Sequence, residues 1–213
     1  MTRADSTFVV KVCGITREED AQAAIDAGAN ALGFNFYPKS PRYVSPERAR
    51  QIVQAVQGDY LKVGVFVNSP EPELLSTGAV VPLDVLQLHG ERLAIPAGER
   101  FRIWRGIPGE TAAPAPDQRI EAYLLDAVTP DYGGSGKAFN WSRAADFPYR
   151  AIVAGGLDAS NVAEAISAVR PWGVDACSRI EAGPGRKDLR GMRDFVARAL
   201  QAREIMFTEE VKS

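Results

Sequence analysis

The sequence predicts a closed (β/α)8 barrel, and three observations lead to this fold class. Eight short apolar runs recur along the 213 residues, and most are near-continuous Val, Ile, Leu and Phe, as in parallel strands covered on both faces. Amphipathic stretches with helix-start signals fill most of the gaps between these runs. An open, doubly wound sheet usually has fewer strands at this length and leaves two edges unpaired. We therefore expect residues 1–213 to form a single barrel domain.

The first elements of this barrel have readable boundaries. The strands are expected at residues 8–13, 31–36, 61–67, 84–89, 101–107, 123–128, 150–154 and 173–177. Thr16 and Glu19 have the spacing of a capping box, and Gly28 is a typical stop, so a helix is expected between them. Ser45 followed by Pro46 predicts the start of the second helix.

The later helices are predicted by the same kind of signal, with one exception. Asp158 or Ser160 can cap a helix after the seventh strand, and Asp188 can cap the last helix. The gap between the fifth and sixth strands contains the helix breakers Pro108, Gly109, Pro114 and Pro116. We therefore expect a degenerate fifth helix, and we expect the chain to fray from about Glu204 onward.

Composition excludes several classes of function. The net charge is -2 and no segment is strongly basic, which argues against nucleic acid or an anionic membrane as a partner. No apolar run approaches the ~20 residues of a membrane helix, and the first seven residues lack an apolar signal core. Two distant cysteines and a single histidine make neither a disulfide framework nor a structural zinc site. We expect a cytoplasmic protein without a metal ion.

Two side chains capable of proton transfer stand at strand ends. Cys13 ends the first apolar run and Asp126 ends the sixth, and chemistry in such folds sits at the carboxyl ends of the strands. A carboxyl group after an apolar strand tends to have a raised pKa, which suits a general acid. Cys13 could act as a base only with help in losing its proton, and a lone strand cysteine is more often a packing residue.

Glycine-rich turns follow the last two strands. Gly155 and Gly156 come after the seventh strand, and Ser178 and residues 183–188 come after the eighth. Backbone N–H groups can approach an anion there without a Cβ in the way, and barrels often bind phosphate at these two loops. Turn formation alone would also account for the glycines. The Gly-Lys pair in GGSGK at 133–137 resembles a nucleotide P-loop only in part, because Ala138 stands where Ser or Thr should bind magnesium.

Two further side chains are candidates for substrate contacts. The guanidinium of Arg42, in the loop after the second strand, could bind a carboxylate bidentately, although a solvated arginine is the simpler interpretation. His89 ends the fourth strand and could line the same mouth, or could serve only as a structural hydrogen-bonding group.

Nine motifs in order along the chain resemble the phosphoribosylanthranilate isomerase family. They lie at residues 11–16 (KVCGIT), 33–43 (GFNFYPKSPRY), 64–68, 86–90 (LQLHG), 125–126, 133–141, 154–157, 173–175 and 183–188 (GPGRKD). Single motifs of this kind are weak, but nine in register over nearly the whole chain are specific. The family lacks a regular fifth helix, in agreement with the proline-rich gap.

The resemblance implies an Amadori rearrangement in tryptophan biosynthesis. Phosphoribosylanthranilate becomes 1-(2-carboxyphenylamino)-1-deoxyribulose 5-phosphate. Asp126 would be the general acid that opens the furanose ring, and Cys13 would be the general base that takes the proton from C2 of the sugar.

The resemblance also implies binding roles and the absence of a cofactor. Arg42 would bind the anthranilate carboxylate, with His89 and Asp175 as further substrate-binding residues. The phosphate would lie at the backbone around the glycine pair Gly155–Gly156 and at Ser178. The substrate's own nitrogen would serve as the electron sink, so neither a cofactor nor a metal ion is expected. The sequence does not indicate the oligomeric state.

Residues 176–179 (ACSR) depart from the small residues and paired serines of many relatives. Arg179 adds positive charge near the expected phosphate, or points to solvent. Cys177 and Cys13 are expected to lie on neighbouring strands, so oxidation could join them and silence the base. Two other functions stay open. One is a sugar-phosphate isomerase of histidine biosynthesis, but that family resembles one that uses an aspartate in place of Cys13, so Cys13 counts against it. The other is a catalytically silent barrel that binds a phosphorylated metabolite.

Overall fold

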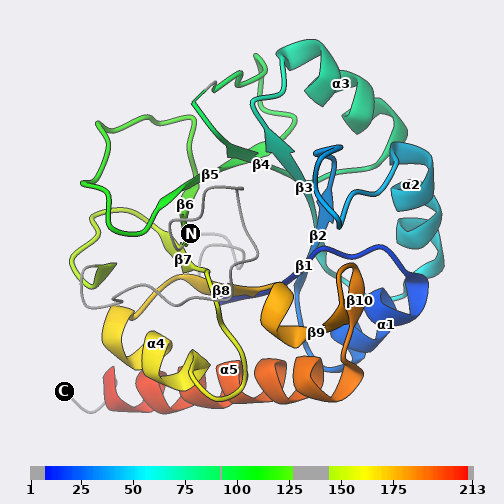
Figure 1. Cartoon of the computed structure of the whole chain (residues 1–213). Helices are drawn as coiled ribbons and strands as arrows, with labels where there is room; N and C mark the ends of the chain where they lie inside the picture. The colour runs from blue at the N-terminus through cyan, green and yellow to red at the C-terminus, as the bar shows by residue number, and fades with distance from the viewer. Residues whose placement is uncertain (1–7, 92, 127–143, 211–213) are drawn as a thin grey trace.

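The eight strands close into a parallel barrel in sequence order, as the sequence predicts. The computed structural model describes residues 8–91, 93–126 and 144–210. Each strand pairs with the next, and β8 pairs with β1 to close the sheet (Figure 1). The strands are β1 (Val9–Cys13), β2 (Ala31–Asn35), β3 (Leu61–Val67), β4 (Val85–His89), β5 (Arg102–Pro108), β6 (Ala122–Asp126), β7 (Ala151–Val153) and β8 (Gly173–Ala176).

Two separate apolar cores stabilise this sheet. Along each strand, alternate residues face the helices and the barrel axis. In β1, for example, Val10 and Val12 belong to the core between sheet and helices, whereas Val9 belongs to the smaller core inside the barrel. The inner core consists of Val9, Ala31, Val63, Val85, Trp104, Ala122, Leu124, Ile152 and Ala154. Residues one or two pleats further along several of the same strands are polar, and they form the site described below.

In the described part of the chain, helices follow five of the eight barrel strands. The helices are α1 (Glu18–Asp26), α2 (Pro46–Ala55), α3 (Glu71–Val80), α4 (Val162–Val169) and α5 (Leu189–Glu210). Residues 109–121 between β5 and β6 contain no helix, which confirms the degenerate fifth helix. The described residues between β4 and β5 also contain none, which was not predicted, and Gly90, Pro96 and Gly98 give a physical reason. Figure 1 shows these two bare stretches as long green loops. None of the described helices is long and apolar enough to span a bilayer.

Half of the predicted caps are correct. The side chain of Ser45 accepts a hydrogen bond from the N–H of Arg48, and the carboxylate of Asp188 accepts from the N–H groups of Arg190 and Gly191, as expected. The predicted capping box at Thr16 is wrong, because its hydroxyl donates to the carbonyl oxygen of Gly185 instead. That contact joins the loop after β1 to the loop after β8.

The cap expected for α4 is also wrong. The carboxylate of Asp158 accepts from Ser160 within the turn and from Arg179, and the helix begins after Asn161 without a side-chain cap. This pairing also places Arg179 on Asp158, with 2.6 Å between Nε and the carboxylate.

The C-terminal helix extends further than expected. Fraying was predicted from about Glu204, but α5 is helical to Glu210. The physical reason is packing: Met206 is buried, and the guanidinium of Arg203 lies over the rings of Phe8 and Phe207. Figure 1 shows α5 running alongside both α4 and α1, so the last helix covers the seam where β8 meets β1.

Candidate active site

Cys13 and Asp126 both face the barrel axis at the carboxyl end of the sheet. Cys13 is the last residue of β1 and lies on the same face as Val9 of the inner core. Asp126 is the last residue of β6 and lies on the same face as Leu124 of that core. The two predicted catalytic side chains therefore stand above one apolar floor, on strands that are not neighbours. A substrate between them would have one group on each side.

A buried lysine, which was not among the predicted site residues, lies directly below Cys13. Lys11 is fully buried, and its Nζ lies 2.9 Å from Oδ1 of Asp175. The two residues are register partners on β1 and β8. Asp175 was expected to contact substrate; the structure places it in this ion pair, with 7% of its surface exposed. The missed signal was a single cation inside an otherwise apolar strand.

Gly33 of β2 leaves the space that brings the lysine and the cysteine together. A Cβ at this position would lie 2.7 Å from Sγ of Cys13 and 3.0 Å from Nζ of Lys11. Any larger residue would push one of these groups away. The glycine thus fixes the ammonium and the thiol side by side on the barrel axis.

The electrostatics of this cluster favour a thiolate at Cys13. A hydrogen bond from the thiol of Cys177 lowers the pKa of Cys13, and the ammonium groups of Lys11 and Lys187 lower it further against the effect of burial. Burial raises the pKa of Cys177, as does its bond to Cys13, so Cys177 stays protonated and donates.

The ion pair beneath the thiol is shaped by opposing effects. Burial acts to lower the pKa of Lys11, but Asp175 and Cys13 outweigh it and raise that pKa, so the lysine stays charged. Burial raises the pKa of Asp175 to about 7, against the attraction of Lys11. The carboxylate of Asp126 adds a smaller contribution to this rise in the pKa of Asp175.

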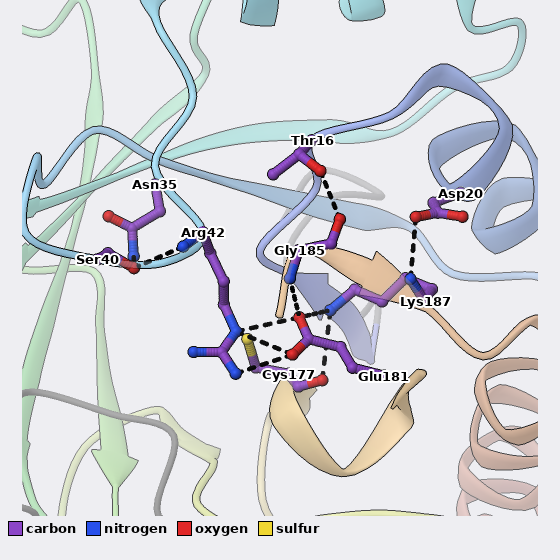
Figure 2. A network of polar contacts seen from close by, with 9 residues as sticks. All are labelled: Thr16, Asp20, Asn35, Ser40, Arg42, Cys177, Glu181, Gly185 and Lys187. Atoms are coloured by element: carbon purple, nitrogen blue, oxygen red, sulfur yellow. Dashed lines mark hydrogen bonds and ion pairs between the residues drawn. The ribbon is translucent and has the colours of Figure 1, made fainter. Parts of the chain in front are cut away.

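Arg42 reaches the same mouth but is already bound to a carboxylate. Its Nε and Nη2 form a bidentate pair with Glu181, at 2.8–3.0 Å. Glu181 belongs to a short hairpin, β9 (Glu181–Gly183) and β10 (Arg186–Lys187), that was not predicted. Lys187 is buried and donates to Glu181 over 3.0 Å. Figure 2 shows the other terminal nitrogen of Arg42 pointing away from Glu181, so this ion pair does not use it.

Backbone contacts anchor this network on several loops. The N–H of Lys187 donates to the buried Asp20 of α1, and that of Gly185 donates to Glu181. On the other side, the hydroxyl of Ser40 accepts from the N–H of Arg42 and from the amide of Asn35 at the end of β2 (Figure 2). The position of Arg42 is therefore fixed by three separate parts of the chain.

His89 lies at the end of β4 and is neutral. Burial lowers its pKa to about 4, helped by Lys11 and Arg105. Its Nε2 lies 2.7 Å from the amide nitrogen of Gln87, one pleat below. Its ring occupies the space above Gly106, where an added Cβ would come within 2.3 Å. A neutral imidazole at this height can donate or accept a hydrogen bond but brings no charge to the mouth.

The predicted phosphate residues come together at the ends of β7 and β8. Gly155 and Gly156 both have positive φ, 82° and 66°, which is accessible to glycine without strain. Ser178 begins a short 3-10 helix (Ser178–Ile180) on the adjacent strand end. Arg179, the residue after Ser178, pairs with Asp158, and this carboxylate compensates the charge of the guanidinium on one side.

Some predictions remain outside the part of the chain that the structure describes. The loop at residues 133–141 is among them. Within the described residues, no three His, Cys, Asp or Glu side chains are grouped so as to hold a metal ion.

Comparisons with known proteins agree with this geometry. A family model described as "N-(5'phosphoribosyl)anthranilate (PRA) isomerase" matches residues 10–198. The N-(5'-phosphoribosyl)anthranilate isomerase of Solibacter usitatus (strain Ellin6076) is 46% identical over 199 residues, covering 92% of this chain and 98% of the relative.

Solved structures extend the agreement to three dimensions. The phosphoribosyl anthranilate isomerase of Thermus thermophilus superposes with a TM-score of 0.79 at 36% identity, over 92% of this chain and 100% of that one. A phosphoribosyl anthranilate isomerase in complex with reduced 1-(o-carboxyphenylamino)-1-deoxyribulose 5-phosphate superposes with a TM-score of 0.74 at 35% identity, with the same coverage. The chain therefore belongs to the N-(5'-phosphoribosyl)anthranilate isomerase family.

Proposed function

We propose that this chain isomerises N-(5'-phosphoribosyl)anthranilate with Cys13 as the general base and Asp126 as the general acid. Family membership supplies the reaction, a step of tryptophan biosynthesis. The observation that carries the residue roles is the opposed placement of the two groups above one apolar floor, with a cation beside the thiol. Acid and base on opposite sides suit a reaction that adds one proton and removes another.

The first step needs the acid. Asp126 would protonate the ring oxygen of the ribose, and the ring would open to a Schiff base between C1 and the anthranilate nitrogen. The second step needs the base. The Cys13 thiolate would remove the proton from C2, the electrons would flow into the Schiff base, and the resulting enolamine would tautomerise to the ketone. The lowered pKa of the Cys13 thiol favours the thiolate that this second role needs.

Arg42 would bind the anthranilate carboxylate through the edge that Glu181 leaves open. A guanidinium has five N–H donors, so one carboxylate on Nε and Nη2 still leaves Nη1 and the second N–H of Nη2. The neutral His89 would add a hydrogen bond at the mouth, and Asp175 would contribute from below through its pair with Lys11.

The phosphate would bind at the ends of β7 and β8. Backbone N–H groups of Gly155, Gly156 and Ser178 are candidates to donate to it, as in other barrels with phosphate at these loops. We also propose a cytoplasmic location, which two free thiols support, because a reducing compartment keeps thiols reduced.

A turnover assay tests the residue roles. Phosphoribosylanthranilate is generated in situ, and the loss of its fluorescence is followed with the native chain, Cys13→Ala and Asp126→Asn. Fast decay with the native chain and decay near background with both variants is the expected result. Decay that survives both substitutions would remove Cys13 and Asp126 from their roles, and substrate binding without any decay would favour a silent barrel.

A further inference from the structure

The pair of Lys11 and Asp175 is costly for a structural element. Both side chains are buried, and taking two charges out of water costs several kcal/mol per ion, roughly, before their attraction is counted. One pleat below, the barrel is closed by Val9 and its apolar neighbours, so closure does not need the ion pair. A buried ion pair in an otherwise apolar core therefore calls for a role beyond packing.

The ion pair of Lys11 and Asp175 lies next to the thiol of Cys13. Lys11 and Cys13 are two residues apart on β1 and face the same side, and Asp175 is the register partner of Lys11 on β8. A Cβ on Gly33 would lie within 3.0 Å of both Nζ and Sγ, so the two groups share the space beside this glycine. Asp175 holds the ammonium from the side of β8, with 2.9 Å between Nζ and Oδ1.

We propose that Lys11, held in place by Asp175, is a positioning residue that keeps Cys13 as a thiolate, ready to act as the base. The proposal rests on the proposed function, in which Cys13 takes the proton from C2. Lys11 acts through Cys13 and has no assigned contact with substrate.

Other groups face the thiol but are committed elsewhere. Lys187 donates to Glu181 over 3.0 Å and to the carbonyl oxygen of Cys177 over 3.3 Å. Arg42 gives two of its nitrogens to Glu181. The thiol of Cys177 donates to Cys13 without adding charge. Among these groups, Lys11 is the cation whose ammonium shares with Sγ of Cys13 the space left by Gly33.

The test measures the protonation of Cys13 directly. Alkylation by iodoacetamide is followed against pH in a Cys177→Ser background, so that Cys13 is the remaining cysteine of the chain. Since the thiolate is the nucleophile, the midpoint of the rate profile reports the thiol pKa. Lys11→Met is expected to move this midpoint upward by about 1–3 pH units. Lys62→Met is the matched control, because Lys62 also pairs with an aspartate, Asp84, but lies away from the site.

An unchanged midpoint in Lys11→Met would overturn the proposal. If the single variant does not fold, Lys11→Met with Asp175→Asn avoids an unpaired buried charge, and its midpoint is still expected to rise. This readout needs no turnover, so it separates the two hypotheses. A low midpoint in a chain without isomerase activity would refute only the proposed function. Full activity with an unshifted Lys11→Met profile would refute only the role of Lys11.

The two thiols carry a second, independent inference. Cys13 and Cys177 directly follow Val12 and Ala176, which are register partners on β1 and β8. Sγ of Cys177 also lies 3.0 Å from the position of a Cβ on Gly14, next to Cys13. Residues opposite each other on neighbouring strands are within the usual Cα separation of a disulfide. We also infer that peroxide closes a disulfide between Cys13 and Cys177 and thereby switches off the base.

The chemistry of this switch balances. The Cys13 thiolate attacks hydrogen peroxide and becomes a sulfenic acid, with release of one water. The thiol of Cys177 then attacks the sulfenic sulfur, the S–S bond forms, and a second water leaves. Two thiols are oxidised and one peroxide is reduced. A dithiol reductant reverses the step by exchange.

Peroxide treatment of the native chain tests this inference. The expected result is loss of both titratable thiols, loss of the mass of two hydrogen atoms, and full recovery of activity with dithiothreitol. Cys177→Ser is the matched control, because its Cys13 lacks a partner thiol and is expected to oxidise further and not recover. Two titratable thiols in the native chain after treatment, or irreversible loss equal to that of the control, would contradict the disulfide.

Discussion

Two levels of the barrel interior are built from the same strands with opposite chemistry. Along β1 the inward residues run Val9, Lys11 and Cys13. Along β4 they run from Val85 through Gln87 to His89. The lower level is apolar on nearly every strand, whereas the upper level is charged or polar on β1, β4, β6 and β8. The lower level buries apolar area and stabilises the fold, and the upper level forgoes that gain in order to place reactive groups.

This difference between the two levels predicts which substitutions should change stability and which should change catalysis. A change at the lower level should lower the free energy of unfolding and leave the chemistry intact. Replacing Cys13 or Asp126 at the upper level should do the reverse, because neither side chain belongs to the apolar cores that stabilise the barrel. The predictions below test this separation between stability and chemistry, beginning with the largest expected effect.

The largest effect is expected at Asp126. Asp126→Asn keeps the shape of the side chain but removes the acidic proton, and the loss of one general acid is expected to lower kcat about 100- to 10,000-fold. Steady-state kinetics with phosphoribosylanthranilate measures it. The thermal midpoint of the variant should stay within roughly a few degrees of the native value, because Asp126 is a half-buried strand end outside both apolar cores. A large drop in thermal midpoint together with near-native kcat would break the comparison.

The next effect is expected at Ile152 of β7, in the inner core. Ile152→Ala removes three carbon atoms from a fully buried site and should cost about 2–5 kcal/mol of the free energy of unfolding, measured by urea denaturation. Ile152→Val is the graded control and should cost about 0.5–1.5 kcal/mol. Both variants should retain native kcat/KM at a temperature where they are folded. Loss of activity in a folded Ile152→Ala protein would show that the two levels are coupled.

A smaller effect is expected at Arg42. Arg42→Lys keeps the charge but loses the planar edge that would bind the anthranilate carboxylate, so KM is expected to rise about tenfold or more, as for one lost charged hydrogen bond. Arg48→Lys is the matched control, because Arg48 pairs with Glu18 on the surface and its KM should not change. Equal KM values for the native chain and Arg42→Lys would remove Arg42 from substrate binding.

Another effect concerns the stability of the protein in acid and depends on His89. Its pKa is about 4 in the fold and about 6.5 when unfolded, so the unfolded state binds the proton first and stability is lost as pH falls from about 6.5 toward 4. Near pH 5 this loss is expected to be about 2 kcal/mol. In His89→Gln the difference in unfolding free energy between neutral pH and that pH should shrink by this amount. An unchanged difference would mean that His89 is not buried in its neutral form.

Most of the fold could be predicted because its signals are local. Apolar runs define the eight strands to within about two residues at each end, and Ser45 and Asp188 cap helices as expected. The wrong caps have long-range causes. The hydroxyl of Thr16 is taken by Gly185, which lies 169 residues later, and no local pattern could reveal that competition.

The site divides in the same way. Cys13 and Asp126 could be identified because strand ends are readable, and their roles remain proposals. Lys11 was also readable, as the one cation within the apolar strand β1, but its partner on β8 appears only when the barrel closes. The pairing of Arg42 with Glu181 joins loops 139 residues apart and had no sequence signal.

Paired measurements on Cys13→Ala and Ile152→Ala test the separation of the two levels most directly. For each purified variant, kcat/KM for phosphoribosylanthranilate and the free energy of unfolding are determined in the same buffer. We predict opposite outcomes: near-background turnover with a native-like free energy of unfolding for Cys13→Ala, and native turnover with a lowered free energy of unfolding for Ile152→Ala. Active Cys13→Ala, or a stable but inactive Ile152→Ala, would contradict the account.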